Sequence, residues 1–325
     1  MFSAKLRAFV AGLILVTGFV QAAENPDSGK SDPGKSDPGK SEIEKPAVLV
    51  MGATGRQGGA VVDELLSRGH VVRAMTRKPQ GKKAQRLIGL GVEVVRGDYG
   101  DPVSLLAAMD ELERAFFYSG FSRNELQESK NVIEAARQSG IRHLIYSSGA
   151  AADPENGMTG SVKAQVELAL RDSGVPFTVM RPVSFMENFR GRQKRTIEQG
   201  VVDSRAPDRQ VYFIAIADIG FFVAEAFDRP DEWLGRGENI AGDQMTLTEL
   251  TQTFGAVLGR DIEYVRKPLE EYLQGFPPPL RPLFRWYDEV GYSADTDGWR
   301  VRYPGLVTLE QYLRATGWEN WQPDR

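Results

Sequence analysis

A strand that runs directly into a glycine-rich turn is the feature that most constrains the fold of this chain. The apolar run 47–50 leads into Met51-Gly52-Ala53-Thr54-Gly55-Arg56-Gln57-Gly58-Gly59. Gly52 permits the positive φ of a tight turn, Gly55 lets the backbone approach a pyrophosphate, and Gly58 lets the following helix pack close to the strand. The N-terminus of that helix would present free N–H groups and the positive end of its dipole. The motif therefore predicts a turn that binds the pyrophosphate of a dinucleotide.

The residues after the turn complete a β-α-β unit. Gly69 ends a segment with helical spacing and precedes the apolar strand 70–75. The apolar positions of that segment are Ala60, Val61, Val62, Leu65 and Leu66. Three glycines at this spacing are weak evidence by themselves, because the chain has 34 glycines. Their position between a strand and a helix makes the prediction specific.

The alternation of strands and helices continues along the chain and indicates the fold class. Strand character falls on 92–95, 115–119, 141–147 and 177–180, and helical periodicity on 102–112, 126–139 and 161–173. This alternation predicts an α/β fold with a doubly wound parallel sheet of the Rossmann type. After Pro182 the segments shorten, with strands at 210–215 and 238–241 and helices at 219–227, 246–258 and 307–315. We expect residues 46–182 to form the Rossmann core, and residues 183–325 to form mainly a smaller α/β lobe over the carboxyl edge of the sheet.

Composition excludes several classes of function. Hydrophobic residues make up 41% of the 325 residues, which is typical of a globular protein. The formal net charge is −4 and the basic residues are spread along the chain, so we expect no nucleic-acid partner. The absence of cysteine excludes disulfides, thiolate metal sites and a cysteine nucleophile, and two histidines make a metal site improbable. His70 begins a strand and His143 lies within one, so we expect both to be packing or edge residues.

The N-terminal segment has the pattern of a secretory signal. Lys5 and Arg7 precede the apolar run 9–20, and Ala22-Ala23 offers a small-residue cleavage site. Residues 24–45 repeat Ser-Asp-Pro-Gly-Lys and predict a disordered linker. We therefore expect residues 1–23 to be a signal peptide and the protein to be exported to the periplasm. The alternatives are a retained membrane anchor, which would make the membrane a partner, and a cytoplasmic protein with an untargeted N-terminus.

The end of the second strand indicates which dinucleotide fits. An acidic residue there bonds a ribose 2′-hydroxyl, whereas a basic residue accommodates a 2′-phosphate. Here the strand ends in Thr76-Arg77-Lys78-Pro79, and no acidic residue lies between Arg73 and Gly91. This pattern favours NADP(H) over NAD(H), with Arg77 as the phosphate clamp beside Lys78. The alternative is that Arg77, Lys78, Lys82 and Lys83 form a solvated face.

The end of the third strand offers a carboxylate for the adenine. Asp98 in Gly97-Asp98-Tyr99 could bond the adenine amino group. Asp101 is better placed to cap the helix that begins at Pro102. Asp98 is therefore free for a ligand.

Several motifs together resemble the NmrA-like family, an atypical branch of the short-chain dehydrogenase/reductase superfamily. The resemblance covers about residues 46–325 and rests on GATGRQGG, TRKP, GDYGD, SGAAADP, SVKAQVE, MRPVSFMEN, YFIAIADIG, AGDQMTLTEL and YPGLVTLEQYLRATGW. It implies an NADP-binding Rossmann domain with a small C-terminal lobe. By position, it implies that the pyrophosphate is held by Gly52, Ala53, Thr54, Gly55, Arg56 and Gln57, the 2′-phosphate by Arg77 and the adenine by Asp98 and Tyr99. It likewise implies that Ser119, Gly120 and Phe121 lie along the ribose, Lys163 at the nicotinamide ribose, and Phe185, Met186, Glu187 and Asn188 over the nicotinamide end.

One departure from the wider superfamily bears on catalysis. Active reductases of that superfamily carry a tyrosine four residues before the lysine, and its phenol acts as the general acid. Thr159 stands at that position before Lys163, and an aliphatic hydroxyl does not ionise near neutrality. Ser147 or Ser148 could still hydrogen-bond a substrate carbonyl. The candidate catalytic residues are therefore Lys163, Ser147 and Ser148.

Three functions remain open on this evidence. The first is an NADP(H)-binding protein of the NmrA-like type whose oxidoreductase activity is weak or unproven. The second is an NADPH-dependent reductase of a quinone, another conjugated carbonyl or a small aromatic substrate, with Lys163 or water as the proton source. The third is an interaction module that senses the NADP+/NADPH ratio, a role that the family resemblance implies.

Two groups of residues beyond the turn keep alternative roles. Glu187 could act as a base near the nicotinamide or serve as a hydrogen-bonding partner for its loop. Phe276, Phe284, Trp286 and Tyr287 could line the mouth of a substrate site or only close the small lobe. Glu270 and Glu271 are expected on a solvated helix face.

Overall fold

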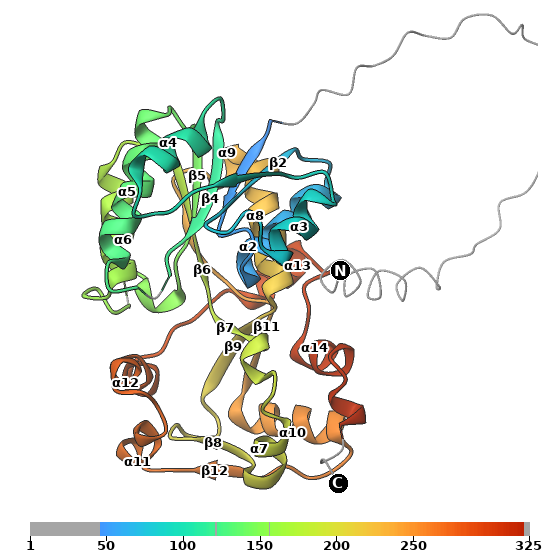
Figure 1. Cartoon of the computed structure of the whole chain (residues 1–325). Coiled ribbons are helices and arrows are strands. Elements are labelled where there is room, and N and C mark those ends of the chain that lie inside the picture. The colour runs from blue at the N-terminus through green and yellow to red at the C-terminus, as the bar shows by residue number, and fades with distance from the viewer. Residues whose placement is uncertain (1–45, 121, 156, 322–325) are drawn as a thin grey trace, which may run out of the picture.

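The computed structural model describes residues 46–120, 122–155 and 157–321 and is built on a seven-stranded sheet (Figure 1). Its strand order is β10-β6-β5-β4-β1-β2-β3, and every neighbouring pair is parallel. The strands are β1 (Val48–Met51), β2 (Val72–Thr76), β3 (Glu93–Arg96), β4 (Arg114–Tyr118), β5 (His143–Ser147), β6 (Phe177–Pro182) and β10 (Gly237–Ile240). The order reverses between β1 and β4, where such folds bind their ligands. The predicted Rossmann-type fold is confirmed.

Helices cover both faces of this sheet. One face carries α2 (Arg56–Ser67), α3 (Lys82–Ile88) and α8 (Ile216–Asp228), and the other carries α4 (Pro102–Met109), α5 (Glu125–Gln138) and α6 (Val162–Asp172). The central strand β1 is buried along its whole length. Val48 and Val50 belong to the core under α2 and α8, while Leu49 and Met51 belong to the core under α4 and α5. A strand buried on both faces has a continuous apolar sequence, as Val48–Met51 has.

The remaining elements form a smaller part below the carboxyl edge of the sheet in Figure 1. Its strands are β7 (Ser184–Phe185), β9 (Gln210–Ile214) and β11 (Asp243–Thr246) in one sheet, and β8 (Val201–Asp203) and β12 (Tyr264–Arg266) in another. Its helices are α7 (Gln193–Gln199), α10 (Leu247–Leu258), α11 (Leu269–Gln274), α12 (Arg281–Glu289) and α14 (Leu309–Ala315). Met186, Phe213, Phe254 and Trp318 contribute to its separate core. This part is the small lobe.

The chain after residue 183 is not confined to the small lobe. Helix α8 packs along α2, where Gly220 allows the two backbones to approach closely. Strand β10 pairs with β6 at the edge of the large sheet, and α9 (Pro230–Trp233) and α13 (Thr296–Arg302) also lie beside it. Residues 183–325 therefore form the small lobe and also contribute α8, α9, β10 and α13 to the large sheet and its layers. The edge of β6 and the apolar face of α2 would otherwise be exposed to solvent.

The capping boxes explain where two helices of the small lobe begin. Thr246 and Glu249 cap α10 reciprocally, and Thr308 and Gln311 cap α14 in the same way. Within the described part of the chain, no helix is both long enough and apolar enough to cross a membrane. The signal-peptide and linker predictions fall on residues 1–45, which lie outside the described residues.

Candidate functional site

The glycine turn lies between the end of β1 and the start of α2. Gly52 has φ +65°, a conformation that L side chains rarely adopt. Its carbonyl accepts a hydrogen bond from the Gly55 amide at 2.8 Å. A Cβ on Gly58 would overlap the Gly52 carbonyl oxygen and lie 2.7 Å from its carbon, so only glycine fits there. No side chain caps α2, and the amides of its first turn are therefore available to a phosphate.

Tyr118, at the end of β4, lies against this turn. Its hydroxyl donates a hydrogen bond to the Gly52 carbonyl at 3.3 Å. A Cβ on Gly55 would overlap the Tyr118 hydroxyl, and one on Gly52 would lie 2.8 Å from the same oxygen. Glycine is therefore required at position 55 because the Tyr118 hydroxyl leaves no room for a Cβ. Burial raises the pKa of Tyr118 while the charge of Arg56 lowers it, which places the Arg56 guanidinium near the phenol.

The basic residues predicted to hold the 2′-phosphate follow β2. Arg77 and Lys78 are both exposed, and neither makes an ion pair within the described residues. The Lys78 amide donates to the Thr76 hydroxyl at 3.3 Å, and that hydroxyl lies 3.3 Å from the hydroxyl of Thr54 in the glycine turn. Arg77 is thus held next to the turn with its guanidinium free for a ligand. Its role in binding stays a prediction.

The two predicted adenine contacts, Asp98 and Tyr99, follow β3 and differ in their burial. Asp98 is exposed, and its carboxylate accepts a hydrogen bond from the Gly100 amide at 2.9 Å. Asp101 caps α4 by accepting from the Val103 and Ser104 amides, as expected. Tyr99 is partly buried, and its hydroxyl donates to the Tyr118 carbonyl at 3.3 Å. The Tyr99 ring therefore supports the end of β4.

A buried hydrogen-bond network surrounds the side chain of Lys163. The Lys163 ammonium donates to the Ser119 hydroxyl at 3.0 Å and lies 3.8 Å from a Glu125 carboxylate oxygen. The Ser119 hydroxyl donates to that same oxygen at 2.6 Å and lies 3.0 Å from the Tyr146 hydroxyl. Ser119 is thus bound inside the protein through its side chain. Sequence analysis found Lys163 and Ser119 but missed Glu125 and Tyr146.

The two serines at the end of β5 are both buried. The Ser147 hydroxyl donates to the Gln57 side-chain oxygen at 2.8 Å, which connects β5 to the first turn of α2. That donor is therefore used within the protein. Ser148 lies next along the chain, and its backbone amide donates to the Met180 carbonyl at 2.8 Å. Thr159 is exposed in the turn that precedes α6.

The segment after β6 crosses from the sheet to the small lobe. Phe185 packs against the core of the sheet, Met186 is buried in the core of the small lobe, and Asn188 is exposed. The Glu187 carboxylate accepts from the Ile216 amide at 3.1 and 3.2 Å, at the N-terminus of α8. Burial raises the pKa of Glu187, and these backbone hydrogen bonds oppose that rise. Glu187 is thus hydrogen-bonded to the start of α8, and a role near the nicotinamide stays a prediction.

Two of the predicted ribose contacts, Gly120 and Phe121, follow Ser119 along the chain. Gly120 is exposed, and a Cβ there would meet no other atom within 4 Å. Phe121 lies outside the described residues.

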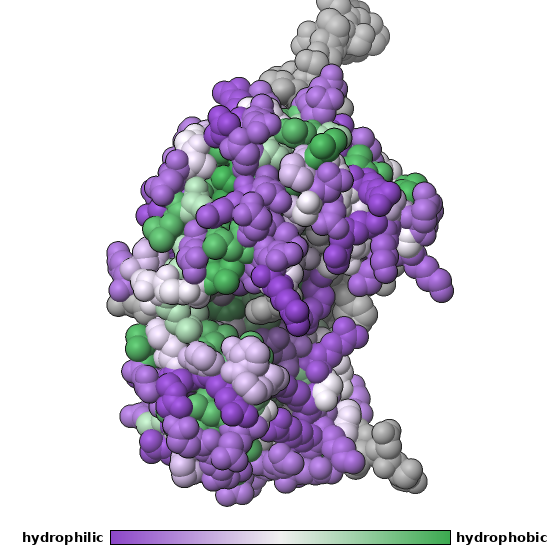
Figure 2. Space-filling model, turned by 60° about the vertical axis from the view of Figure 1, so that its left-hand side comes forward, coloured by the Kyte–Doolittle hydropathy of each residue, from purple (hydrophilic) through white to green (hydrophobic). Residues whose placement is uncertain are grey.

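Aromatic rings gather where α12 approaches β7 and β9. The Tyr292 hydroxyl accepts a hydrogen bond from the Ser184 amide at 3.1 Å. Its ring lies 6.0 Å from the ring of Tyr212, 5.3 Å from Tyr287 and 6.1 Å from Trp286. No residue of α12 is fully buried, and a role of these rings in lining a substrate site stays a prediction. On the face shown in Figure 2, the surface is hollowed between the sheet and the small lobe, and hydrophobic residues gather there.

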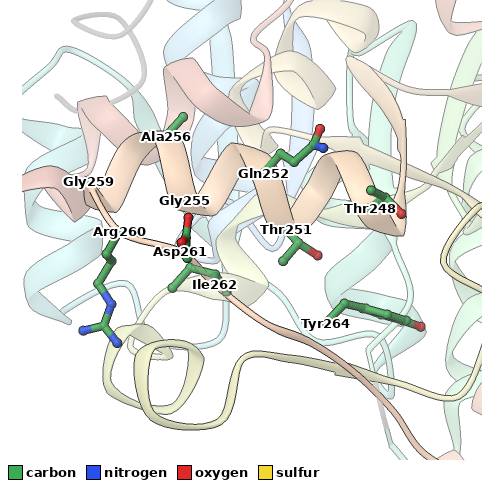
Figure 3. Close-up of a pocket in the computed structure, with 10 residues that line it drawn as sticks. All are labelled: Thr248, Thr251, Gln252, Gly255, Ala256, Gly259, Arg260, Asp261, Ile262 and Tyr264. Carbon is green, nitrogen blue, oxygen red and sulfur yellow. The ribbon is translucent and has the colours of Figure 1, made fainter.

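Two cavities lie away from the glycine turn. One of about 650 Å³ lies on the small lobe between α10 and the segment before β12, where Thr251, Gln252 and Tyr264 line it (Figure 3). The other, of about 620 Å³, lies beside β10 and α13 and is lined by Arg236 and Asn239 among others. Within the described residues, no group of His, Asp and Glu side chains could hold a metal ion.

The sequence of this chain is similar to a known protein family and to individual enzymes. The family model described as the NmrA-like family matches residues 44–313. A (4-alkanoyl-5-oxo-2,5-dihydrofuran-3-yl)methyl phosphate reductase from Streptomyces griseus is 30% identical over 245 residues, or 73% of this chain and 84% of that protein. Quinone oxidoreductase 2 of Escherichia coli is 28% identical over 221 residues, which are 67% of this chain and 76% of that protein.

A solved structure shows the same similarity in three dimensions. The NADPH-dependent quinone oxidoreductase from Escherichia coli, complexed with NADPH, superposes with a TM-score of 0.73 at 25% identity. The superposition covers 83% of this chain and 99% of that one. The similarity therefore includes both the sheet and the small lobe.

Proposed function

Because this chain belongs to the NmrA-like family, we propose that binding of NADP(H) is its primary act. The glycine turn is the observation that carries this proposal. Gly52 has the positive φ of such a turn, Gly58 lies against the Gly52 backbone, and α2 begins with uncapped amides. These are the features that a pyrophosphate requires of a protein backbone.

The preference for NADP(H) over NAD(H) rests on Arg77. Its guanidinium is exposed beside the glycine turn and makes no ion pair within the described chain. A planar guanidinium can bind a 2′-phosphate through two charge-assisted hydrogen bonds. Between Arg73 in β2 and Gly91, every side chain that could contact the ribose is neutral or basic.

Calorimetric titration of the protein with NADPH and with NADH tests this proposal. Arg77→Ala should lower the affinity for NADPH by about tenfold or more, since hydrogen bonds to charged groups contribute about 1.5–3 kcal/mol. The affinity for NADH should not change. Arg86→Ala is the matched control, because Arg86 is already bound to Asp63 at 2.8 Å. Equal losses of NADPH affinity in both variants would refute the role of Arg77, and no binding of either dinucleotide to the wild-type protein would refute the proposal itself.

A second candidate function is reduction of a quinone or another conjugated carbonyl. The partly buried rings of Tyr212, Trp286, Tyr287 and Tyr292 favour it, as do the reductase and quinone oxidoreductase activities of the two relatives. Bound NADPH would supply a hydride to the acceptor. Lys163 would donate the proton or orient the water that does. Steady-state oxidation of NADPH with a panel of quinones tests this function, and turnover above about 1 s⁻¹, within the usual range of enzymes, would exclude binding alone.

Export is proposed from the sequence of the first 23 residues. Lys5, Arg7, the apolar run 9–20 and Ala22-Ala23 follow the order of a cleaved signal. Fractionation of cells that express a C-terminally tagged chain, followed by N-terminal sequencing, tests this proposal. A full-length product in the cytosol would refute it.

A further inference from the structure

The hydrogen-bonding capacity of Ser119 is completely used by its three neighbours. A serine hydroxyl has one donor and two acceptor positions. Ser119 gives its proton to the Glu125 carboxylate at 2.6 Å and accepts one from the Lys163 ammonium at 3.0 Å. The Tyr146 hydroxyl at 3.0 Å must then be the second donor. Burial raises the pKa of Tyr146, which keeps that phenol protonated. Every hydrogen bond in this network therefore has a fixed direction.

Glu125 is the carboxylate that neutralises Lys163. The carboxylates that act on the Lys163 charge are those of Glu125, on α5, and Glu167, on α6 itself. Glu167 is bound to the buried guanidinium of Arg181 through 2.8 Å and 3.0 Å contacts, so its charge is already matched. Glu125 makes its ion pair with Lys163 alone among the described residues. Burial lowers the pKa of Lys163, and the two carboxylates oppose that effect.

The network leaves part of the ammonium free. The Lys163 side chain is 27% exposed, and only one of its three N–H donors is used by Ser119. Its Nζ lies 6.0 Å from the centre of the Tyr146 ring, which restricts the side chain on a second side. The donors that Ser119 and Glu125 do not engage remain for a ligand at the carboxyl edge of β4 and β5.

We propose that Glu125 is the positioning residue of the dinucleotide site: acting through Ser119, it holds the Lys163 ammonium against the Tyr146 ring, with a remaining donor available to the dinucleotide. The inference rests on the proposed function for the identity of that ligand. The arrangement of Glu125, Ser119 and Lys163 belongs to the protein alone and can be tested without it.

The first experiment measures the titration of Lys163 directly. Full-length protein labelled with [13Cε]lysine is titrated by NMR, and Lys163→Met assigns the signal. Glu125→Gln keeps an acceptor for Ser119 but removes the charge, so the pKa of Lys163 should fall by about one unit or more. Glu128→Gln is the matched control, because Glu128 lies on the same helix and accepts from the Ser122 hydroxyl at 2.8 Å on the exposed surface. An equal pKa of Lys163 in all three proteins would overturn the proposal.

The second experiment asks whether Glu125 acts through Lys163. In the wild-type background, Glu125→Gln should weaken NADPH binding about fivefold or more, a typical coupling for contacting residues. In the Lys163→Met background the same change should have no effect. Equal losses in both backgrounds would show that Glu125 supports only the fold, and would overturn the proposal.

Two provisions distinguish a failure of the Glu125 proposal from a variant that does not fold and from a failure of the proposed function. If Glu125→Gln does not fold, Ser119→Ala replaces it, because that change breaks the link and leaves both charges in place. Ser119→Ala should then weaken NADPH binding only when Lys163 is present, and a loss that is independent of Lys163 would overturn the proposal. If wild-type protein binds no dinucleotide, the proposed function fails, while the lysine titration still decides the role of Glu125.

Discussion

Two adjacent glycines of α2 provide a matched test of the glycine turn. A Cβ on Gly58 would overlap the Gly52 carbonyl oxygen and lie 2.7 Å from the Gly52 carbonyl carbon and 3.0 Å from the Ala53 Cα. All of these atoms are backbone, so the turn itself must move. A Cβ on Gly59 would meet only the Ala53 carbonyl oxygen at 3.6 Å, which is ordinary contact. Both positions lie in the same helix, so the change in helix propensity is similar for both.

The expected free energies follow from these contacts. Replacing glycine by alanine inside a helix favours the folded state by up to about 1 kcal/mol. Gly59→Ala should therefore raise the free energy of unfolding slightly. At Gly58, overpacking against backbone costs about 1–3 kcal/mol, and here the upper end applies because no side chain can move aside. Gly58→Ala should then unfold more easily than Gly59→Ala by about 3 kcal/mol, the overpacking term alone.

Urea unfolding monitored by far-UV circular dichroism measures this difference, provided that both variants keep the same m value. Calorimetry with NADPH gives an independent reading, because Gly58→Ala displaces the turn whereas Gly59→Ala leaves it in place. Equal unfolding midpoints for the two variants would refute the close approach of α2 to the turn. If the midpoints are equal but only Gly58→Ala loses NADPH binding, then residue 58 affects the ligand site without packing closely against the turn.

Three further changes test contacts beyond the turn. Gly55→Ala should cost about 1–3 kcal/mol of unfolding free energy, because the new Cβ overlaps the Tyr118 hydroxyl and lies 3.1 Å from the Gly52 carbonyl oxygen. Tyr118→Phe should restore the part due to the hydroxyl in a double-mutant cycle, since the ring carbon that bears it is 3.4 Å away. Burial lowers the pKa of His143 to about 4, so the native state resists protonation that the unfolded state accepts below about pH 6.5. Stability should therefore fall by about 3 kcal/mol as the pH drops from 6.5 to 4, and urea titrations of His143→Gln should lack that component. Glu167→Gln removes the nearer of the two carboxylates beside the buried Arg181 guanidinium and leaves only that of Asp153, at 3.9 Å. It should cost about 3 kcal/mol, visible as a loss of roughly 10 °C in Tm, whereas a loss under 2 °C would contradict the burial of this pair.

The predictable part of the fold is the part with long-range periodicity. The strands of the large sheet that precede residue 183, and helices α2, α5 and α6, match the expected segments because each carries a continuous apolar run or a helical spacing. Helix α3 was missed because it is short and only Ala84 and Leu87 are buried. Helices α12 and α13 were missed for a similar reason: α12 contains a proline, α13 contains a glycine, and both bury few side chains.

The place of β10 could not be derived from periodicity. The segment 238–241 has strand character, but nothing local says that it pairs with β6 rather than with a strand of the small lobe. That choice depends on α8, which returns the chain to the large sheet by packing on α2. Contacts between elements that are distant in sequence decide the edge of the sheet.

The predictable part of the site is its backbone. The positive φ of Gly52, the close packing of Gly58 and the cap at Asp101 all follow from local chemistry, and all three are observed. Tyr118 and Tyr146 were missed because their contacts depend on neighbouring strand ends. The register of β4 and β5 pairs Phe117 with Tyr146 and Tyr118 with Ser147. The order of the strands, together with this register, brings Tyr118 to the glycine turn and Tyr146 to Ser119.

The departure at Thr159 involves the backbone as well as the side chain. Residues four apart face one another only when both lie on the same helix. Here Ser161 caps α6 through the Ala164 amide and the helix begins at Val162, so residue 159 lies in the preceding turn and is exposed. A phenol at that position would not share a helix face with Lys163, whose ammonium is bound to Ser119 instead. The Ser147 proton is also committed, to Gln57. A single restored tyrosine at position 159 would therefore not recreate the general acid of the wider superfamily, and under the proposed reductase function the proton would have to come through Lys163 or water.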